Sequence, residues 1–407
     1  MSNQVKIIAL LVGAGVQFGL LVVNLIITSK MQIEDRGVYA LVVAVVMTVS
    51  GFCNLGFSNA LIKRMHSEEL SKIYITSIAN LIFIQVFCAV IVATLLLLTF
   101  PVISYDLLSE FLYVVVLVIV GLLLRSYGQA VLLGLNKIFL FQISKVLPVL
   151  LFAIILLAQN KYEIEYVLFA WMASELLLIL YLVLSIIVVI KVDRDNENNS
   201  FHEDLRFGLK SLFGHTAFIE GYKFDLIILG YIIPAAELAI YSVSKSVALV
   251  LRFVPQSLSQ VAYPAILRAN KDEKINVLKK FIFIAIMSSV LLVVIGYSLF
   301  ISVVIDFLGE EYVETQSVVF IMFLGVFAYV PRRISYEYLK AVNKPSLTSK
   351  IEVYVLFSYL SLVLLFEAFN YSGLLPLSIL ILVINVSALF IVYRVLLGYK
   401  ASDTVKL

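Results

Sequence analysis

The sequence is poor in charge and in side chains that bind metals. Only 14% of its 407 residues are charged, and it contains two cysteines, three histidines and one tryptophan. Soluble domains carry about 25% charged residues, so this composition excludes a secreted enzyme, a nucleic-acid-binding domain and a disordered protein. Neither cysteine stands in a C-x-x-C pattern, and the histidines share no ligand spacing with each other or with the cysteines. We therefore expect no metal site and no cofactor.

Motifs for catalysis are missing as well. The chain has no G-x-x-x-x-G-K-[ST] phosphate-binding loop, so we expect no nucleotide hydrolysis. Its loops supply no Ser-His-Asp or metal-dyad constellation, and no external loop is long enough to carry the active site of a membrane polymerase or ligase. We expect that the protein is not an enzyme.

Long apolar runs dominate the chain instead. Hydrophobic residues make up 62% of it, and the mean hydropathy is +1.06. A membrane-spanning helix needs about 20 apolar residues. Runs of that length occur at 7–28, 37–60, 73–99, 111–134, 139–158, 164–190, 207–231, 236–266, 279–305, 313–339, 349–369 and 374–397. The pattern predicts an all-α polytopic membrane protein with about 12 transmembrane helices.

Positive charge is distributed unevenly between the predicted loops. If the N-terminus is cytoplasmic, the inside segments carry nineteen Lys and Arg residues, and the outside segments carry only Lys30, Arg36 and Lys161. Cytoplasmic loops of membrane proteins are enriched in these two residues. The distribution predicts that both termini are cytoplasmic and that the number of spans is even.

An internal repeat divides the chain. Arg125 stands eleven residues before Asn136-Lys137, and Arg332 stands eleven residues before Asn343-Lys344, at an offset of 207 residues. The polar run 191–206 lies near the midpoint and predicts a mobile cytoplasmic linker. We expect two parallel six-helix lobes, residues 1–195 and 196–407, around a central cavity. We expect Arg125 and Arg333 to extend toward the cytoplasmic interface.

The predicted eighth span carries a polar, cationic stripe. At 100° per residue its members fall within about 40° of one line: Tyr241, Lys245, Arg252, Gln256, Ser259 and Tyr263. Ionisable groups within a span usually face a bundle interior or a wet cavity. We favour a cavity wall that binds an anion, and the alternative is a set of interhelical hydrogen bonds and salt bridges.

Three other spans carry polar residues that could line the same cavity. The seventh contains Lys223, which could neutralise Glu220, and Asp225, which could pair with Lys245. The first contains Gln17 and Asn24 on one side, and the second contains Asn54. For the first and second spans, ordinary polar contacts between helices are an equally good explanation.

Several diffuse motifs resemble those of the Wzx-type polysaccharide flippases of the multidrug/oligosaccharidyl-lipid/polysaccharide (MOP) exporter superfamily. They are Glu34-Asp-Arg-Gly-Val-Tyr39-Ala, Asn54-Leu-Gly-Phe-Ser-Asn-Ala-Leu-Ile-Lys63-Arg64, Arg125 to Lys137, Asp225-Leu-Ile-Ile-Leu-Gly and Glu237-Leu-Ala-Ile-Tyr241-Ser. The resemblance covers essentially the whole chain. It implies an undecaprenyl-diphosphate-linked oligosaccharide as substrate, and an inner-membrane location with surrounding membrane lipid. It also implies a polysaccharide polymerase and chain-length machinery as partners, and no nucleic acid.

The resemblance and the charges together suggest roles for the candidate residues. Lys245, Arg252 and Lys223 would hold the diphosphate. Sugar binding or gating would fall to Gln17, Asn24, Asn54, Asp225, Tyr241 and Gln256. A multidrug cation antiporter of the same superfamily is the main alternative, and a polytopic enzyme of polysaccharide assembly is a weaker one. The antiporter should have an acidic cavity, whereas the charged residues of the seventh and eighth spans sum to +1: Glu220, Lys223, Asp225, Lys245 and Arg252.

Reporter fusions test the predicted orientation. A fusion at Leu407 should report the cytoplasm, and one in the purely acidic 306–314 loop should report the opposite side, because the charge distribution puts them on different faces. Reports from the same side would contradict both the orientation and the even number of spans.

Overall fold

The computed structural model describes most of the chain and is almost entirely helical. The described residues are 3–67, 70–159, 161–189, 192–193, 201–214, 223–251, 253–270, 273–300, 305–342, 344–369 and 373–404. Within them the strands are two residues long: β1 (Leu70–Ser71) pairs in parallel with β2 (Val192–Asp193). The protein is a polytopic all-α membrane protein, as the apolar runs predict.

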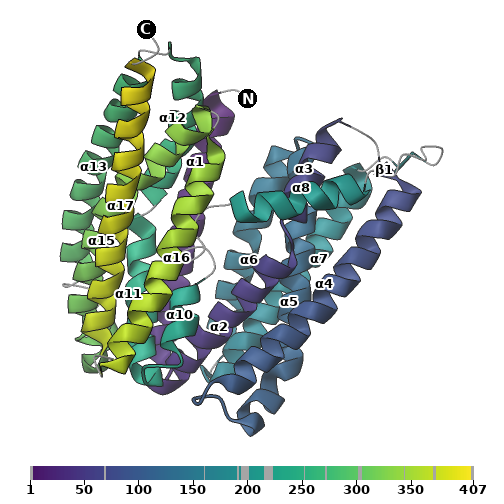
Figure 1. The fold of residues 1–407 in the computed structure, drawn as a ribbon. Coiled ribbons are helices and arrows are strands. Elements are labelled where there is room, and N and C mark those ends of the chain that lie inside the picture. The colour runs from purple at the N-terminus through teal and green to yellow at the C-terminus, as the bar shows by residue number, and fades with distance from the viewer. Residues whose placement is uncertain are drawn as a thin grey trace. The chain divides into compact units, whose positions relative to one another are not determined.

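Two compact units make up the chain (Figure 1). The first contains α1 (Asn3–Lys30), α2 (Ile33–Cys53), α3 (Phe57–Ser67), α4 (Lys72–Thr99), α5 (Tyr105–Gly134), α6 (Ile138–Ala158), α7 (Ile164–Val189), α8 (Phe201–Gly214), α10 (Phe224–Leu229) and the first residues of α11 (Ala235–Leu251). The second contains the rest of α11, α12 (Phe253–Arg268), α13 (Lys274–Leu299), α14 (Ile305–Leu308), η2 (Glu310–Tyr312), α15 (Thr315–Ala341), α16 (Pro345–Ala368) and α17 (Leu374–Thr404).

The lengths of the helices agree with most of the predicted spans. Among the described residues, nine helices are long and apolar enough to cross a membrane, and α1 adds a shorter apolar stretch, Gly15–Lys30. The predicted seventh span, 207–231, is described as two separate helices, α8 and α10, with residues 215–222 outside the description. The predicted eighth span corresponds to α11 and α12, of 17 and 16 residues. The total of twelve spans therefore stays a prediction.

The internal repeat is visible in how each unit packs. In the first unit α5 packs against α7, α3 and α4, and α6 packs against α7. In the second unit α15 packs against the corresponding helices α17, α12 and α13, and α16 packs against α17. The matching residues Arg125 and Arg332 lie on α5 and α15, the helix that each unit packs around. The sequence offset of 207 residues thus reflects a repeated helical arrangement.

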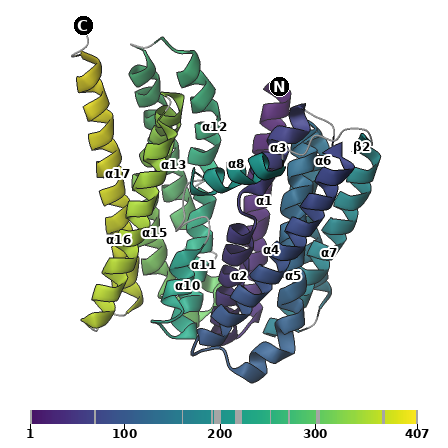
Figure 2. The same cartoon turned by 45° about the vertical axis from the view of Figure 1, so that its right-hand side comes forward.

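The end of the predicted linker is a packed helix. Residues 201–206 form the first turns of α8, which crosses the helices of its unit rather than running along them (Figures 1 and 2). Phe201 and Leu205 lie one turn apart and pack against the apolar core beside α3. The Tyr74 hydroxyl donates a hydrogen bond to Asp204 (2.7 Å), and Arg64 lies 3.4 Å from the same carboxylate. These contacts correct the expectation of a mobile linker through residue 206.

The compact units also divide later in the chain than the predicted boundary at residue 195. The first unit includes α8 and α10 and continues to Leu238. One physical reason is a close backbone approach between α8 and the start of α3. A Cβ atom on Gly208 would stand 3.0 Å from the Leu55 carbonyl oxygen and 3.1 Å from the backbone of Phe57. A side chain larger than glycine would need the backbone to move by a few tenths of an ångström, so glycine favours this close packing of α8 within the first unit.

Gly37 provides a test of packing in the first unit. A Cβ atom there would lie 1.9 Å from the Ala235 carbonyl oxygen, and a backbone atom cannot move aside as a side chain would. We expect Gly37→Ala to lower the free energy of unfolding by at least about 2 kcal/mol. Thermal unfolding of the purified protein in detergent measures the change.

Gly15 on α1 is the matched control, because nothing lies within 4 Å of the Cβ that Gly15→Ala would add. This variant should unfold at the wild-type temperature or slightly above it, since alanine favours helix. Equal behaviour of the two variants would refute the close packing at Gly37.

Candidate functional site

The described part of the predicted cationic stripe lies on α11. Tyr241 and Lys245, one turn apart, are buried, with exposed fractions of 1% and 7%. Both make interactions within the protein. Arg252 lies outside the described residues, and Gln256 lies on α12 with its side chain outside the description. The structure therefore establishes a buried cation beside a buried tyrosine on α11, and the continuation of the stripe stays a prediction.

Lys223 and Asp225 stand at the start of α10. Lys223 precedes the helix in the left-handed conformation, with φ 50°, and Asp225 lies in the first helical turn with an exposed fraction of 3%. A carboxylate in the first turn interacts favourably with the positive end of the helix dipole. Both residues make interactions within the protein. The pairing of Asp225 with Lys245 stays a prediction, and Glu220 lies outside the described residues.

Asn24 takes part in a polar contact between α1 and α2. The Arg36 guanidinium donates to the Asn24 side-chain oxygen and to the Thr28 hydroxyl, both at 3.0 Å, and lies 5.3 Å from the Tyr39 ring centre. Arg36 is 2% exposed and lies in the first turn of α2 rather than in a loop, and its side of the membrane stays a prediction. Asn24 thus binds a neighbouring helix, as the alternative explanation expects, whereas Gln17 is half-buried on α1.

Asn54 holds a break between α2 and α3. The chain passes through positive φ values at Leu55 (54°) and Gly56 (65°), so the helix cannot continue. The Asn54 amide nitrogen donates to the Ser126 hydroxyl (3.2 Å), and its amide oxygen accepts from the Ser58 hydroxyl (3.0 Å). Asn54 therefore connects α2, α3 and α5, a structural role that the polar pattern alone did not distinguish from sugar binding.

A second polar chain reaches the same break from α4 and α5. The Tyr127 hydroxyl donates to the Gln85 side-chain oxygen (2.7 Å), and the Gln85 amide nitrogen donates to the Asn54 carbonyl oxygen (3.4 Å). Gln85 is 2% exposed. In an apolar environment such bonds satisfy the backbone groups that the helix break frees.

A charged cluster on α5, α6 and α7 was missed by sequence reasoning. The Arg125 guanidinium lies 2.9 Å from a Glu175 carboxylate oxygen, and Glu175 is 2% exposed. Lys145 of α6 lies near enough to experience the charge of Arg125. Arg125 therefore pairs with a carboxylate instead of extending only to the interface. The available hint was that Glu175 is the one charged residue of α7 beyond its first turn.

The second unit pairs its own arginines. Arg332, at 1% exposed, lies 3.8 Å from Glu352, which also accepts a hydrogen bond from the Tyr336 hydroxyl (2.6 Å). Arg333 lies 3.6 Å from Glu337 on the same helix. The repeated arginine thus pairs with α7 in the first unit and with α16 in the second, so the repeat preserves the cation and not its partner.

These observations define what the spans can do chemically. Among the described residues no group of three or more His, Cys, Asp or Glu side chains could hold a metal ion. The spans do bury cations, and the cluster on α5–α7 has two cations, Arg125 and Lys145, against the single carboxylate of Glu175. Such an arrangement favours an anion over a cation.

The chain is similar to known transporters. A family model described as "Polysaccharide biosynthesis protein" matches residues 5–270. A sequence comparison with curated proteins finds no match.

Solved structures of similar fold cover nearly the whole chain. A lipid II flippase, MurJ, in an inward closed conformation has a TM-score of 0.72 at 14% identity, over 95% of this chain and 87% of that one. A multidrug resistance MATE family transporter of the MOP superfamily, inward-facing, has 0.65 at 14%, over 100% and 96%. A MOP superfamily transporter from Pyrococcus furiosus has 0.51 at 14%, over 98% and 95%. At such identities the likeness concerns the fold.

Removing one member of the Arg125–Glu175 pair tests its energetic role. Glu175→Ala leaves the Arg125 charge in an apolar span, so we expect a loss of about 2 kcal/mol in unfolding free energy, less than for a fully buried pair because Arg125 is partly exposed. Replacing both residues by leucine should recover most of this loss. Melting in detergent and abundance in membranes measure the effect.

Lys340→Ala is the matched control, because it breaks a more exposed pair with Glu337, three residues earlier on α15. It should change the melting temperature little. If Glu175→Ala were equally mild, the first pair would contribute nothing to stability.

Proposed function

We propose that this chain, which belongs to the polysaccharide biosynthesis protein family and shares its fold with MOP superfamily transporters and a lipid II flippase, is itself a flippase. Its proposed substrate is an undecaprenyl-diphosphate-linked oligosaccharide. The oligosaccharide is an O-antigen or similar surface polysaccharide repeat unit. It moves across the cytoplasmic (inner) membrane by alternating access, with both termini of the protein in the cytoplasm. The product then passes to a polysaccharide polymerase and its chain-length machinery.

The buried cation of α11, Lys245, which is 7% exposed and lies one turn from the buried Tyr241, is the observation that carries this proposal. Two further cations, Arg125 of α5 and Lys145 of α6, lie near each other in the first unit, where Arg125 pairs with Glu175. Ionisable side chains within membrane spans are costly to keep, and they commonly mark the pathway of a substrate. A lipid diphosphate carries negative charge, and it cannot cross hydrocarbon unaided.

In this proposal the diphosphate is held by Lys245, Arg252 and Lys223. Lysine acts as a point charge, and arginine binds phosphate oxygens with two parallel hydrogen bonds. Tyr241, Gln256 and Gln17 bind sugar hydroxyls, with Asp225 as a gating partner of Lys245. Asn24 and Asn54 act indirectly, because their amides hold α1 against α2 and fix the break between α2 and α3.

A multidrug cation antiporter is the second candidate, because a MATE transporter has the same fold over the full length of this chain. An organic cation requires a cavity with negative charge. The buried charge on α11, Lys245, has the opposite sign, which favours the flippase.

Alanine substitution tests the diphosphate site. Lys245→Ala or Arg252→Ala should reduce delivery of lipid-linked glycan at least about tenfold, the loss of one charge-assisted contact, while the protein still inserts into the membrane. Arg252→Lys should recover only part of the activity, because a point charge does not reproduce a bidentate contact. Surface glycan is measured beside protein abundance in a strain that lacks the native flippase.

Lys280→Ala provides the control, since Lys280 is an exposed cation near the start of α13. It should leave glycan delivery unchanged. Normal transport by the double variant Lys245→Ala/Asp225→Ala would show that Lys245 serves only as a partner of Asp225, and the proposed diphosphate role would be wrong.

A further inference from the structure

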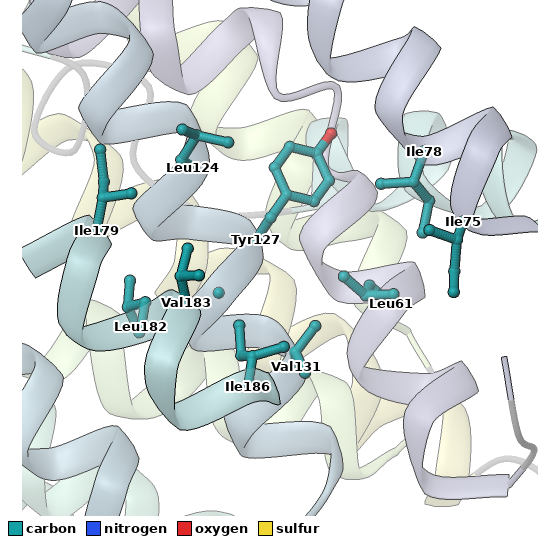
Figure 3. A pocket seen from close by; sticks show the side chains of 11 residues that line it. Leu61, Ile75, Ile78, Leu124, Tyr127, Val131, Ile179, Leu182, Val183 and Ile186 are labelled. Atoms are coloured by element: carbon teal, nitrogen blue, oxygen red, sulfur yellow. The ribbon is translucent and has the colours of Figure 1, made fainter. Parts of the chain in front are cut away.

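The first unit has an apolar groove between α4 and α7, with α5 as its floor (Figure 3). Its volume is about 250 Å³. Leu61 of α3 with Ile75 and Ile78 of α4 forms one wall. The other wall is formed by α7, which contributes Leu182 and Val183. Gly128 belongs to the floor, and a Cβ there would lie 3.0 Å from Leu182, so glycine keeps α5 and α7 close beneath the groove.

The groove offers nothing to a polar ligand. Tyr127 is the one lining residue with a polar side chain, and its hydroxyl lies at the end of the ring away from Val183 and Ile186 (Figure 3). That hydroxyl already donates to Gln85 (2.7 Å). A cavity without polar partners does not hold ordered water, so its occupant must be apolar.

The walls of the groove continue into surfaces that suit lipid. Between Ile73 and Thr99, α4 has no charged residue, and α7 has none after Glu175. Side chains beside the groove are apolar and exposed, from Val183 (46%) to Ile187 (70%) and Val188 (85%). A face on an aqueous pathway would carry polar side chains. The groove is therefore continuous with the lipid-facing surface of the spanning helices.

A cation lies near the groove wall, at the contact between α3 and α8. Lys63 follows Leu61 on α3 and is exposed, with its ammonium 5.0 Å from the Phe207 ring centre of α8. Phe207 is itself 41% exposed. An exposed cation beside an exposed aromatic ring is typical of the membrane–water interface, where anionic headgroups lie.

We propose that this groove binds one acyl chain of an anionic bilayer phospholipid whose headgroup lies beside Lys63. The chain packs on the ring of Tyr127, whose hydroxyl leads through Gln85 to the helix break at Asn54. The bound lipid thus supports the bend between α2 and α3 from the membrane side. This site is separate from the proposed diphosphate site and does not depend on the transported substrate.

Native mass spectrometry of the full chain tests the site, with phosphatidylglycerol as the probe lipid. Val183→Phe fills the groove, and Val188→Phe makes the same change five residues later on α7, outside the groove. We expect Val183→Phe to lower the abundance of the one-lipid adduct about tenfold, which corresponds to displacing roughly two methylene groups. Val188→Phe should keep the wild-type amount. Equal retention by both variants would overturn the proposal.

Two further measurements exclude other occupants. Added undecaprenyl phosphate should leave the abundance of the lipid adduct that is sensitive to Val183→Phe unchanged. Displacement of that adduct would assign the groove to the lipid chain of the substrate instead.

Cysteine labelling tests whether the groove contains water. In a chain with Cys53→Ser and Cys88→Ser, Val183→Cys should resist a hydrophilic maleimide in vesicles, while Lys63→Cys reacts. Rapid labelling of Val183→Cys would show a water-filled groove and overturn the proposal.

Discussion

The fold depends on one constraint: inside hydrocarbon, each polar group must find its partner within the protein. Helices satisfy their own backbone groups, so the spans are helical almost by necessity. The constraint then applies to every departure from regular helix and to every charge. At the α2–α3 break, Asn54 and Gln85 supply the hydrogen bonds. Within the spans, Glu175 pairs with Arg125 and Glu352 pairs with Arg332, so each arginine has a carboxylate of opposite charge beside it.

The same constraint explains how the repeat diverged. Both units keep an arginine on the helix that the others pack around, but Arg125 pairs with α7 and Arg332 pairs with α16. An unpaired arginine would be too costly to retain, so a carboxylate must be present somewhere within reach. Its position on a particular helix is free to change. The repeat therefore preserves the architecture and permits each unit its own polar interior.

The proposed diphosphate site and the proposed lipid groove differ in chemistry. The buried cation Lys245 is proposed to bind the diphosphate of the substrate. The groove beside Val183 attracts a lipid chain because it has no polar atom to offer. Tyr127 has its ring on the groove and its hydroxyl in the hydrogen-bonded chain that leads through Gln85 to Asn54. One residue thus connects the membrane environment to the bend between α2 and α3.

The sequence by itself determined the class of protein, the approximate spans and the repeat, because these depend on the length of apolar runs and on regular spacing along the chain. It could not distinguish a polar residue that binds substrate from one that binds a neighbouring helix, as Asn24, Arg36 and Asn54 illustrate. It also placed a linker where α8 packs, because the contacts of Phe201 and Asp204 join residues more than 100 positions apart. Only the tertiary structure decides such pairings, since a partner on another helix leaves no trace in local periodicity.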